Sequence, residues 1–295
     1  MSLDSAQLET FAAVVREGSF DAAARVLNVT PSAVSQRIKA LEQAAGQVLV
    51  RRSKPCQATE AGEPLLRLAG QIALLEREAL ATARGGRGGD WTRAAIVVNA
   101  DSLATWFMPA LAAVPAELRL LFDIYTDDQE HTAELLRSGA VMAAVTAQNV
   151  PVQGCRSQRL GAMRYRAVAA PAMFGTWFAD GVTPAALADA PMVVLNRKDR
   201  LQHRFLRTLT RRDLDPPIHY VPSVTAFDEA IRLGLGWGMV PDLVADADLA
   251  EDRYRELVPG GLLNVPLYWQ HWRLESAVLT ALTTAVQAAA ATALR

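Results

Sequence analysis

The stretch that decides the fold runs from Ser19 to Glu42 and reads SFDAAARVLNVTPSAVSQRIKALE. It predicts two short helices joined by a tight turn. Thr30 stands where a helix N-cap should stand, and Pro31 occupies the favoured first helical position. Apolar residues recur every three or four positions, so each helix has one face to bury. These faces hold Ala22, Ala23, Val26 and Leu27 in the first helix, and Val34, Ile38 and Leu41 in the second.

The opposite face of the second helix is polar, because Ser32, Ser35, Gln36 and Lys39 share one spacing. A short polar face of this kind suits a helix that enters the major groove of DNA. An ordinary helical hairpin with a solvated face would look similar. The segment 37–54 favours DNA, since its only acid is Glu42 and its basic residues are Arg37, Lys39, Arg51, Arg52 and Lys54.

Residues 3–62 resemble the winged helix-turn-helix domain of LysR-type transcriptional regulators. The matching pieces are Leu8 to Phe11, Gly18 to Ala24, Thr30 to Glu42, Val50 to Arg52 and Thr59 to Gly62. The resemblance implies that residues 51–58 form the wing and that its basic residues touch phosphates. It predicts a double-stranded DNA operator as partner. The residues predicted to contact this DNA are Pro31, Ser32, Ser35, Gln36, Arg37, Lys39, Arg51, Arg52 and Lys54.

The 295 residues are enough for two or three domains, and 51% of them are hydrophobic, which is ample for buried cores. The net charge is −1, so the basic cluster is local, as expected for a DNA reader joined to a neutral sensor. No segment reads as a signal peptide or a membrane span. Cys56 and Cys155 have no paired spacing, which indicates reduced thiols rather than a disulfide or redox sensor. We therefore expect a cytoplasmic protein with no membrane partner.

A long helix is expected from Thr59, as its cap, to Arg84. A heptad pattern along it predicts a dimerising seam, although a helix packed on its own domain would also show an apolar stripe. The resemblance implies a linker helix paired between subunits, in a homodimer or a homotetramer built as a dimer of dimers. The glycine-rich segment 85–89 marks a domain boundary; it lacks the preceding strand of a phosphate-binding loop. The seam residues are Ala61, Leu65, Leu68, Ile72, Leu75, Ala79 and Thr82.

Beyond this break, β-prone runs alternate with helical patterns, which predicts α/β sheets. The resemblance implies two lobes, like those of periplasmic binding proteins, with a ligand between them. The expected domains are a DNA-binding domain at 1–58, a linker helix at 59–84, a hinge at 85–91, a first lobe at 92–163 and 267–295, and a second lobe at 164–266. The expected strands are 94–99, 118–126, 140–146, 165–170, 192–196, 218–221, 237–241 and 267–272, and helices are expected at 103–114, 131–138 and 276–294.

Two polar segments, 99–106 and 125–131, follow predicted strands. Ser102 is a plausible helix N-cap, and free backbone N–H groups there would favour a carboxylate. Asp127, Asp128 and Glu130 could receive a cationic side chain, although acids at a helix start also stabilise the helix by themselves. A metal site built from Asp127, Asp128 and His131 lacks a second ligand cluster and is rejected. We expect no metal and no cofactor.

Nearly the whole chain resembles the arginine- and lysine-responsive, ArgP/LysG-like branch of the LysR family. The matching segments are 99–106, 127–132, 144–146, 161–165, 196–199, 221–223 and 234–241. This resemblance implies a regulator that senses lysine or arginine and controls export of basic amino acids. Ser102 and Thr105 would hold the backbone end of the amino acid, and one of the acids its cationic end. The predicted effector contacts are Ser102, Thr105, Trp106, Asp127, Asp128, Glu130, Thr146, Asn196 and Ser223.

Rival interpretations are an effector of another kind, such as histidine or an aromatic acid, an enzyme, and a purely architectural DNA-binding protein. The sequence shows no nucleophile–base pair and no cofactor loop, so it predicts no enzyme. An architectural protein would not need a large α/β sensor. RNA polymerase is a further candidate partner of a transcriptional regulator.

Overall fold

The computed structural model describes residues 3–84, 91–126 and 129–295, without the side chains of residues 129–131. The chain divides into two compact units. The first comprises Met1–Val98, Ala113–Gln158 and Tyr268–Ala285, and the second comprises Asn99–Ala112, Arg159–Leu267 and Val286–Arg295. The predicted domains place residues 99–112 and 286–295 in the first lobe, whereas here they pack with the second unit. No helix in the described ranges is long and apolar enough to cross a membrane.

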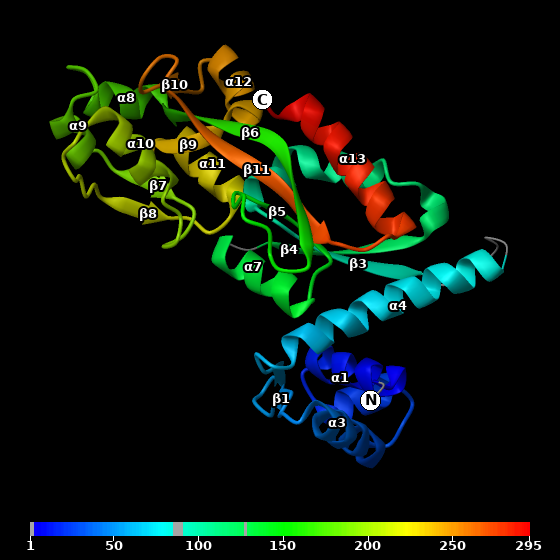
Figure 1. Cartoon of the computed structure of the whole chain (residues 1–295). Helices are drawn as coiled ribbons and strands as arrows, with labels where there is room; N and C mark the ends of the chain where they lie inside the picture. The colour runs from blue at the N-terminus through cyan, green and yellow to red at the C-terminus, as the bar shows by residue number, and fades with distance from the viewer. Residues whose placement is uncertain (1–2, 85–90, 127–128) are drawn as a thin grey trace. The chain divides into compact units, whose positions relative to one another are not determined.

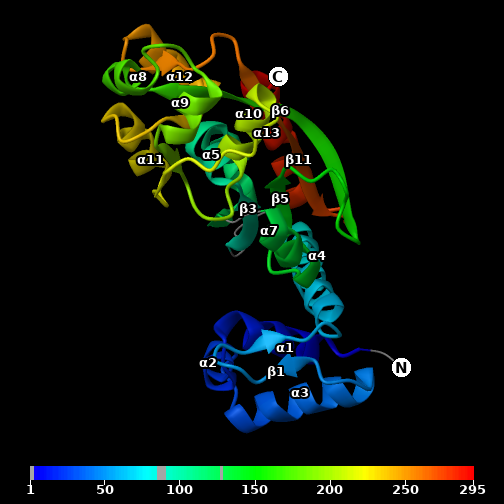
Figure 2. The ribbon, with the colours of Figure 1, turned by 90° about the vertical axis from the view of Figure 1, so that its left-hand side faces the viewer.

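The first unit begins with the N-terminal helical domain, drawn in blue in Figure 2. Two-residue strands form its wing and pair antiparallel, with Val50 opposite Ala58. Leu8 and Phe11 of α1, Ala23 of α2 and Ile38 of α3 are at most 2% exposed and join the three helices in one core. This is the predicted all-α winged helix-turn-helix. Its elements are α1 (Ser5–Glu17), α2 (Phe20–Val26), α3 (Pro31–Ala45), β1 (Val50–Arg51) and β2 (Gln57–Ala58).

Side-chain caps fix where these helices begin. The Thr30 hydroxyl accepts a hydrogen bond from Ala33 N at 3.1 Å, with Pro31 in the first turn, so the predicted cap is confirmed. Gly18 ends α1 with a φ of +71°. A Cβ on Gly18 would lie 2.8 Å from the Pro55 Cβ, so only glycine lets the wing approach α1 this closely.

The linker helix α4 spans Glu63–Ala83 and begins later than predicted. Thr59 does not cap it. The Thr59 hydroxyl accepts from Gly62 N at 3.2 Å and donates to Val48 O at 2.7 Å, which closes a turn before the helix. The residues that α4 buries are Leu66, Ala69 and Leu74, and no predicted seam residue is among them. Leu75, in the predicted seam, is 39% exposed.

A sheet forms the rest of the first unit, and β3 lies between two parallel neighbours, β4 and β5. The end of β11 pairs antiparallel with β5, with Tyr268 opposite Thr146. The predicted alternation of strands and helices is thereby confirmed (Figure 1). The elements are β3 (Thr92–Val98), η2 (Ala116–Leu118), β4 (Leu120–Thr126), α7 (Gln129–Ser138), β5 (Ala143–Thr146), the start of β6 (Cys155–Ala169), the end of β11 (Leu262–Trp272) and the start of α13 (Ala277–Ala293).

In the second unit the end of β6 pairs antiparallel with β9 and β10, and β7 pairs parallel with β8. The predicted strand 165–170 is only the end of β6, which begins at Cys155; its early residues are polar and partly exposed, so no apolar run announces it. The other elements are α5 (Ala100–Ser102), the π-helical turn η1 (Leu103–Phe107), α6 (Met108–Ala112), α8 (Pro171–Trp177), α9 (Pro184–Asp189), β7 (Met192–Val194), α10 (Leu201–Leu209), β8 (Ile218–Tyr220), α11 (Val224–Arg232), β9 (Gly238–Pro241), α12 (Asp242–Ala250) and β10 (Arg255–Glu256).

Candidate functional site

The outer face of α3 is the first candidate site. One predicted contact differs from the rest: Arg37 is partly buried, and its Nη1 donates to the Thr10 hydroxyl at 3.2 Å. Thr10 is fully buried in α1. Arg37 therefore ties α3 to α1, and its contact with DNA stays a prediction. The remaining predicted residues of this face are all exposed: Pro31, Ser32, Ser35, Gln36 and Lys39.

The wing adds exposed positive charge beside this face, from Arg51, Arg52 and Lys54. The Arg52 guanidinium lies 4.9 Å from the centre of the Phe20 ring, which holds the wing against α2. Glu42 forms no ion pair with this charge within the part of the chain that the structure describes. Its Oε1 instead accepts hydrogen bonds from two backbone amides at the start of the wing, Leu49 N at 2.9 Å and Val50 N at 3.3 Å.

The second candidate site is the segment from Asn99 to Trp106. Ser102 is fully buried and ends α5; the N-cap position is occupied by Asn99, so the prediction that Ser102 is an N-cap was wrong. The Ser102 hydroxyl, the Asn99 Oδ1 and the Trp106 Nε1 are buried and have no hydrogen-bond partner among the described residues. Buried polar atoms without partners are rare. A π-helical turn follows at Leu103, and such turns occur frequently at functional sites.

An acid–phenol pair joins this segment to β6. The Tyr165 hydroxyl of β6 donates to Asp101 Oδ2 at 2.7 Å. Burial raises the pKa of Asp101, and the charge of Asp199 raises it further, against the lowering effect of the Tyr165 hydrogen bond. Burial also raises the pKa of Tyr165 well above its usual range, against a smaller lowering by Arg204. Four ionisable side chains from three segments therefore act on one another here.

Sequence reasoning did not select this pair as site residues. Asp101 stands inside a segment that carried the family resemblance, so its position beside Ser102 was the available signal. Its partner Tyr165 is 64 residues further along the chain, and only the fold joins them.

The other predicted effector residues are spread over both units. The Thr105 hydroxyl donates to the backbone carbonyl oxygen of Asp101 at 2.6 Å, so Thr105 is bound to the backbone of Asp101 one turn earlier in the helix. Asn196 is exposed, and its Oδ1 accepts from Asp199 N at 3.1 Å, which shapes the loop that carries Asp199. Thr146 belongs to the first unit, where it is 4% exposed and its hydroxyl accepts from Gln148 N at 3.2 Å.

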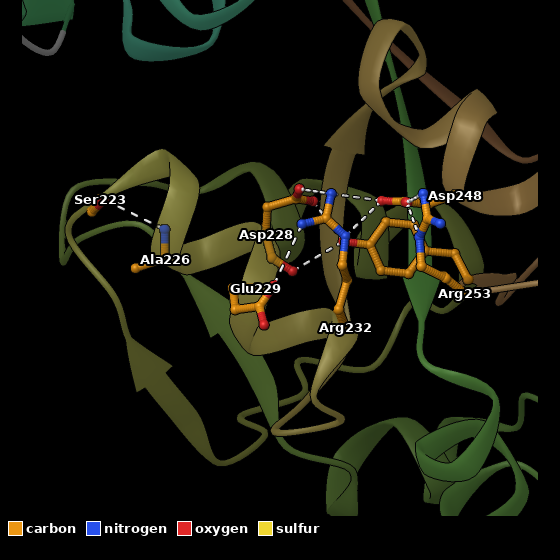
Figure 3. A network of polar contacts seen from close by, with 8 residues as sticks. Ser223, Ala226, Asp228, Glu229, Arg232, Asp248 and Arg253 are labelled. Atoms are coloured by element: carbon orange, nitrogen blue, oxygen red, sulfur yellow. Dashed lines mark hydrogen bonds and ion pairs between the residues drawn. The ribbon is translucent and has the colours of Figure 1, made fainter. Parts of the chain in front are cut away.

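Ser223 begins α11 and is exposed; its hydroxyl accepts from Ala226 N at 3.4 Å. The far end of α11 is anchored by the polar network of Figure 3, in which Arg232 pairs with Asp228 and with Asp248 of α12. Burial would raise the pKa of Asp248, but hydrogen bonds from Arg232 and Arg253 outweigh it and lower this pKa. The network fixes the helix that presents Ser223.

Some predicted features lie outside the described residues. These are Asp127 and Asp128, and the side chains of Glu130 and His131. Within the described residues, no group of three or more His, Cys, Asp and Glu could hold a metal ion. Both cysteines are free and buried, and burial raises the pKa of the Cys155 thiol to about 11. Cys155 is thus a neutral thiol at pH 7, in line with its interpretation as an ordinary cysteine.

The chain combines a winged helix that has an exposed basic face with a two-lobed α/β domain that has a buried polar segment, and a long helix joins the two. This combination defines a ligand-responsive DNA-binding regulator. Comparison with known proteins agrees. Residues 5–63 match the family described as "Bacterial regulatory helix-turn-helix protein, lysR family", and residues 92–291 match the "LysR substrate binding domain". The chain belongs to the LysR family of transcriptional regulators.

The relatives extend over the whole chain. In the crystal structure of ArgP from Mycobacterium tuberculosis, the sequence is 49% identical to this chain. The match covers 100% of this chain and 99% of that chain, with a TM-score of 0.91. Full-length LysG from Corynebacterium glutamicum with bound effector Arg is 40% identical, with 99% of each chain covered and a TM-score of 0.82. The "Lysine export transcriptional regulatory protein LysG" of Corynebacterium efficiens is 42% identical, with 98% of each chain covered.

These findings confirm the resemblance to LysR-type regulators and to the ArgP/LysG-like branch. They also confirm that the chain is a regulator and not an enzyme, since the matched relatives are transcriptional regulators.

Proposed function

We propose that this regulator senses a basic amino acid, lysine or arginine, and controls transcription of an exporter of basic amino acids. The observation that carries the proposal is the similarity over almost the full chain to LysG with bound Arg. The name of the Corynebacterium efficiens relative supports the exporter as target. Histidine or an aromatic acid is the alternative effector.

The chemistry of segment 99–106 fits the backbone end of an amino acid. Asp101 forms no ion pair with a lysine or arginine of the described residues, so its carboxylate is available to an α-ammonium group. Ser102, Thr105 and Trp106 offer two hydroxyls and an indole N–H beside it, of which the buried Ser102 hydroxyl and indole N–H have no partner within the described residues. We assign them to the α-carboxylate and α-ammonium groups.

The cationic end of the effector is assigned to Asp127, Asp128 or Glu130. Three acids in one short segment would favour a guanidinium or ammonium over a neutral side chain through charge-assisted hydrogen bonds. Thr146, Asn196 and Ser223 are assigned to the lining of the site. The proposal predicts that citrulline, the neutral counterpart of arginine, binds weakly.

The regulator acts on DNA through α3 and the wing, as a dimer or a dimer of dimers whose α4 helices pair along the predicted seam. The last part of this seam, Leu75, Ala79 and Thr82, is exposed. We place it in the cytoplasm with the chromosome, and RNA polymerase is its proposed protein partner at the promoter. The effector changes DNA engagement only to the extent that it binds one arrangement of the subunits more tightly than another.

The test is thermal stabilisation of the purified full chain by each amino acid and by citrulline, at matched concentration and pH. A rise in Tm with lysine or arginine, and none with citrulline, supports the proposal, because a ligand that binds only the folded state stabilises it. A rise with histidine or an aromatic acid alone would replace the proposed effector by the alternative. No rise with any of them would refute an amino-acid effector.

A further inference from the structure

Charged side chains of the linker helix α4 reach the ends of two helices of the sensor within the first unit. Arg67 lies near the start of α4. Its Nη1 donates to Arg137 O at 3.2 Å and to Gln153 O at 3.1 Å. Arg137 stands in the last turn of α7, where carbonyl groups lack intrahelical partners and carry partial negative charge. A guanidinium at this place satisfies one carbonyl and has the favourable sign for the helix dipole.

The approach of α4 to this helix end depends on a glycine. Gly139 follows α7 with a φ of +76°. A Cβ built on it would lie 2.5 Å from Arg67 Cα, closer than real Cβ contacts allow. The backbone of α4 therefore rests directly on the turn that ends α7.

Glu78, further along α4, holds a helix start. Its Oε1 accepts hydrogen bonds from the Ser276 hydroxyl at 2.6 Å and from Val278 N at 3.0 Å. Val278 lies in the first turn of α13, where backbone N–H groups lack partners. Ser276 is itself the local cap, since its hydroxyl accepts from Leu279 N at 3.2 Å. A carboxylate at a helix N-terminus again has the favourable sign.

A third contact lies between these two. A Cβ on Gly70 would come within 2.8 Å of Trp272 Cη2, and Trp272 is 3% exposed. Residues 67, 70 and 78 fall on one face of a helix with 3.6 residues per turn, and they span about 16 Å at 1.5 Å per residue. This face of α4 thus fits the sensor at three points, with opposite charges placed at opposite helix ends.

We infer that Arg67 and Glu78 are positioning residues that fix α4 to α7 and α13, so that the DNA-reading domain moves together with this part of the sensor. The α7 helix starts at Gln129, so of the acids proposed to meet the effector Asp127 and Asp128 directly precede it in the sequence and Glu130 belongs to it. If the proposed function holds, effector binding displaces α7. Arg67 then passes this displacement to α4, and α4 passes it to α3.

The first experiment needs no effector. Amide hydrogen exchange at Val278 is measured in the full chain for wild type, Glu78→Ala, Glu78→Gln and the control Glu76→Ala. Glu76 is an exposed acid of the same helix. Loss of a hydrogen bond to a charged acceptor should speed exchange at Val278 by about tenfold in Glu78→Ala. Glu76→Ala keeps the contact and should resemble wild type. Glu78→Gln keeps an acceptor oxygen but loses the charge, so its exchange rate should lie between those of wild type and Glu78→Ala. Equal exchange in Glu78→Ala and wild type would overturn the assignment of Glu78.

The second experiment measures coupling. Arg67→Ala and the control Arg77→Ala, an exposed arginine of the same helix, are compared for arginine affinity and for the factor by which arginine changes DNA affinity. We expect Arg67→Ala to leave arginine affinity within about twofold and to bring the coupling factor close to one, with partial recovery in Arg67→Lys. A merely structural role would lower Tm and leave the factor unchanged, and that result would overturn the route. If no amino acid binds, the proposed function fails, while the exchange experiment still decides the role of Glu78.

Discussion

Replacing Arg51 by Ala tests the wing as a phosphate-binding element. Arg51 is exposed on β1, and no ion pair joins it to another described residue, so its removal perturbs the fold little. Arg52 is a poorer choice, because it also stacks on Phe20. Each phosphate contact contributes about 0.9 to the slope of log K against log salt. If both protomers of a dimer make the contact, the slope falls by about 1.8.

That change in slope is large enough to measure. Between 50 and 200 mM salt the logarithm of the salt concentration rises by about 0.6, so wild type should lose about 12-fold more affinity than the variant over this range. The assay is fluorescence anisotropy on a duplex of arbitrary sequence, since phosphate contacts do not depend on base sequence. Arg207→Ala, an exposed arginine of α10, is the control. An unchanged slope in Arg51→Ala would refute the wing assignment.

Further predictions concern base reading, the effector and stability. Gln36→Ala should lower affinity for a selected operator more than for arbitrary duplex DNA, and equal losses would remove Gln36 from base reading. Asp101→Asn should lower the affinities for arginine, lysine and citrulline by similar factors in calorimetric titrations, since all three carry the α-ammonium group. A loss of affinity confined to the basic amino acids would place the cationic end of the effector at Asp101. Because burial raises the pKa of Asp101, wild-type affinity should rise as pH rises through that pKa, while Asp101→Asn stays flat. Asp248→Asn should cost about 2 kcal/mol of unfolding free energy at pH 7. The lowered pKa of Asp248 means that this contribution exists above its unfolded pKa and disappears as pH falls through the folded one, so the difference in denaturant midpoint should shrink in acid; a pH-independent difference would contradict it.

The DNA-reading domain could be predicted from sequence because its signals are local. The cap at Thr30, Pro31 after it and the buried stripe of α3 all lie within a few residues of one another. The two predicted caps failed for different reasons. Thr59 donates to Val48 O in a turn before α4. Ser102 is the third residue of the helix that begins after Asn99, and its buried hydroxyl has no partner among the described residues.

The sensor was harder to predict in detail, because its contacts join residues that are far apart in the chain. The hydroxyl of Tyr165 reaches Asp101 across 64 residues, and Ser276 reaches Glu78 across 198. Neither pair leaves a periodic signal. The heptad seam shows that a periodic signal alone does not identify the buried face of a helix. Periodicity selected one face of α4, while the face that α4 buries carries Leu66, Ala69 and Leu74.

We propose that a basic amino acid in the sensor and DNA on α3 act on one another through this chain. Thermodynamic linkage requires that arginine changes DNA affinity by the same factor by which DNA changes arginine affinity. The most direct measurement determines both factors on the full chain, with a duplex selected from a random pool by the protein itself. We expect two equal factors that differ clearly from one, and both factors should approach one when citrulline replaces arginine. Two factors equal to one with arginine would contradict it.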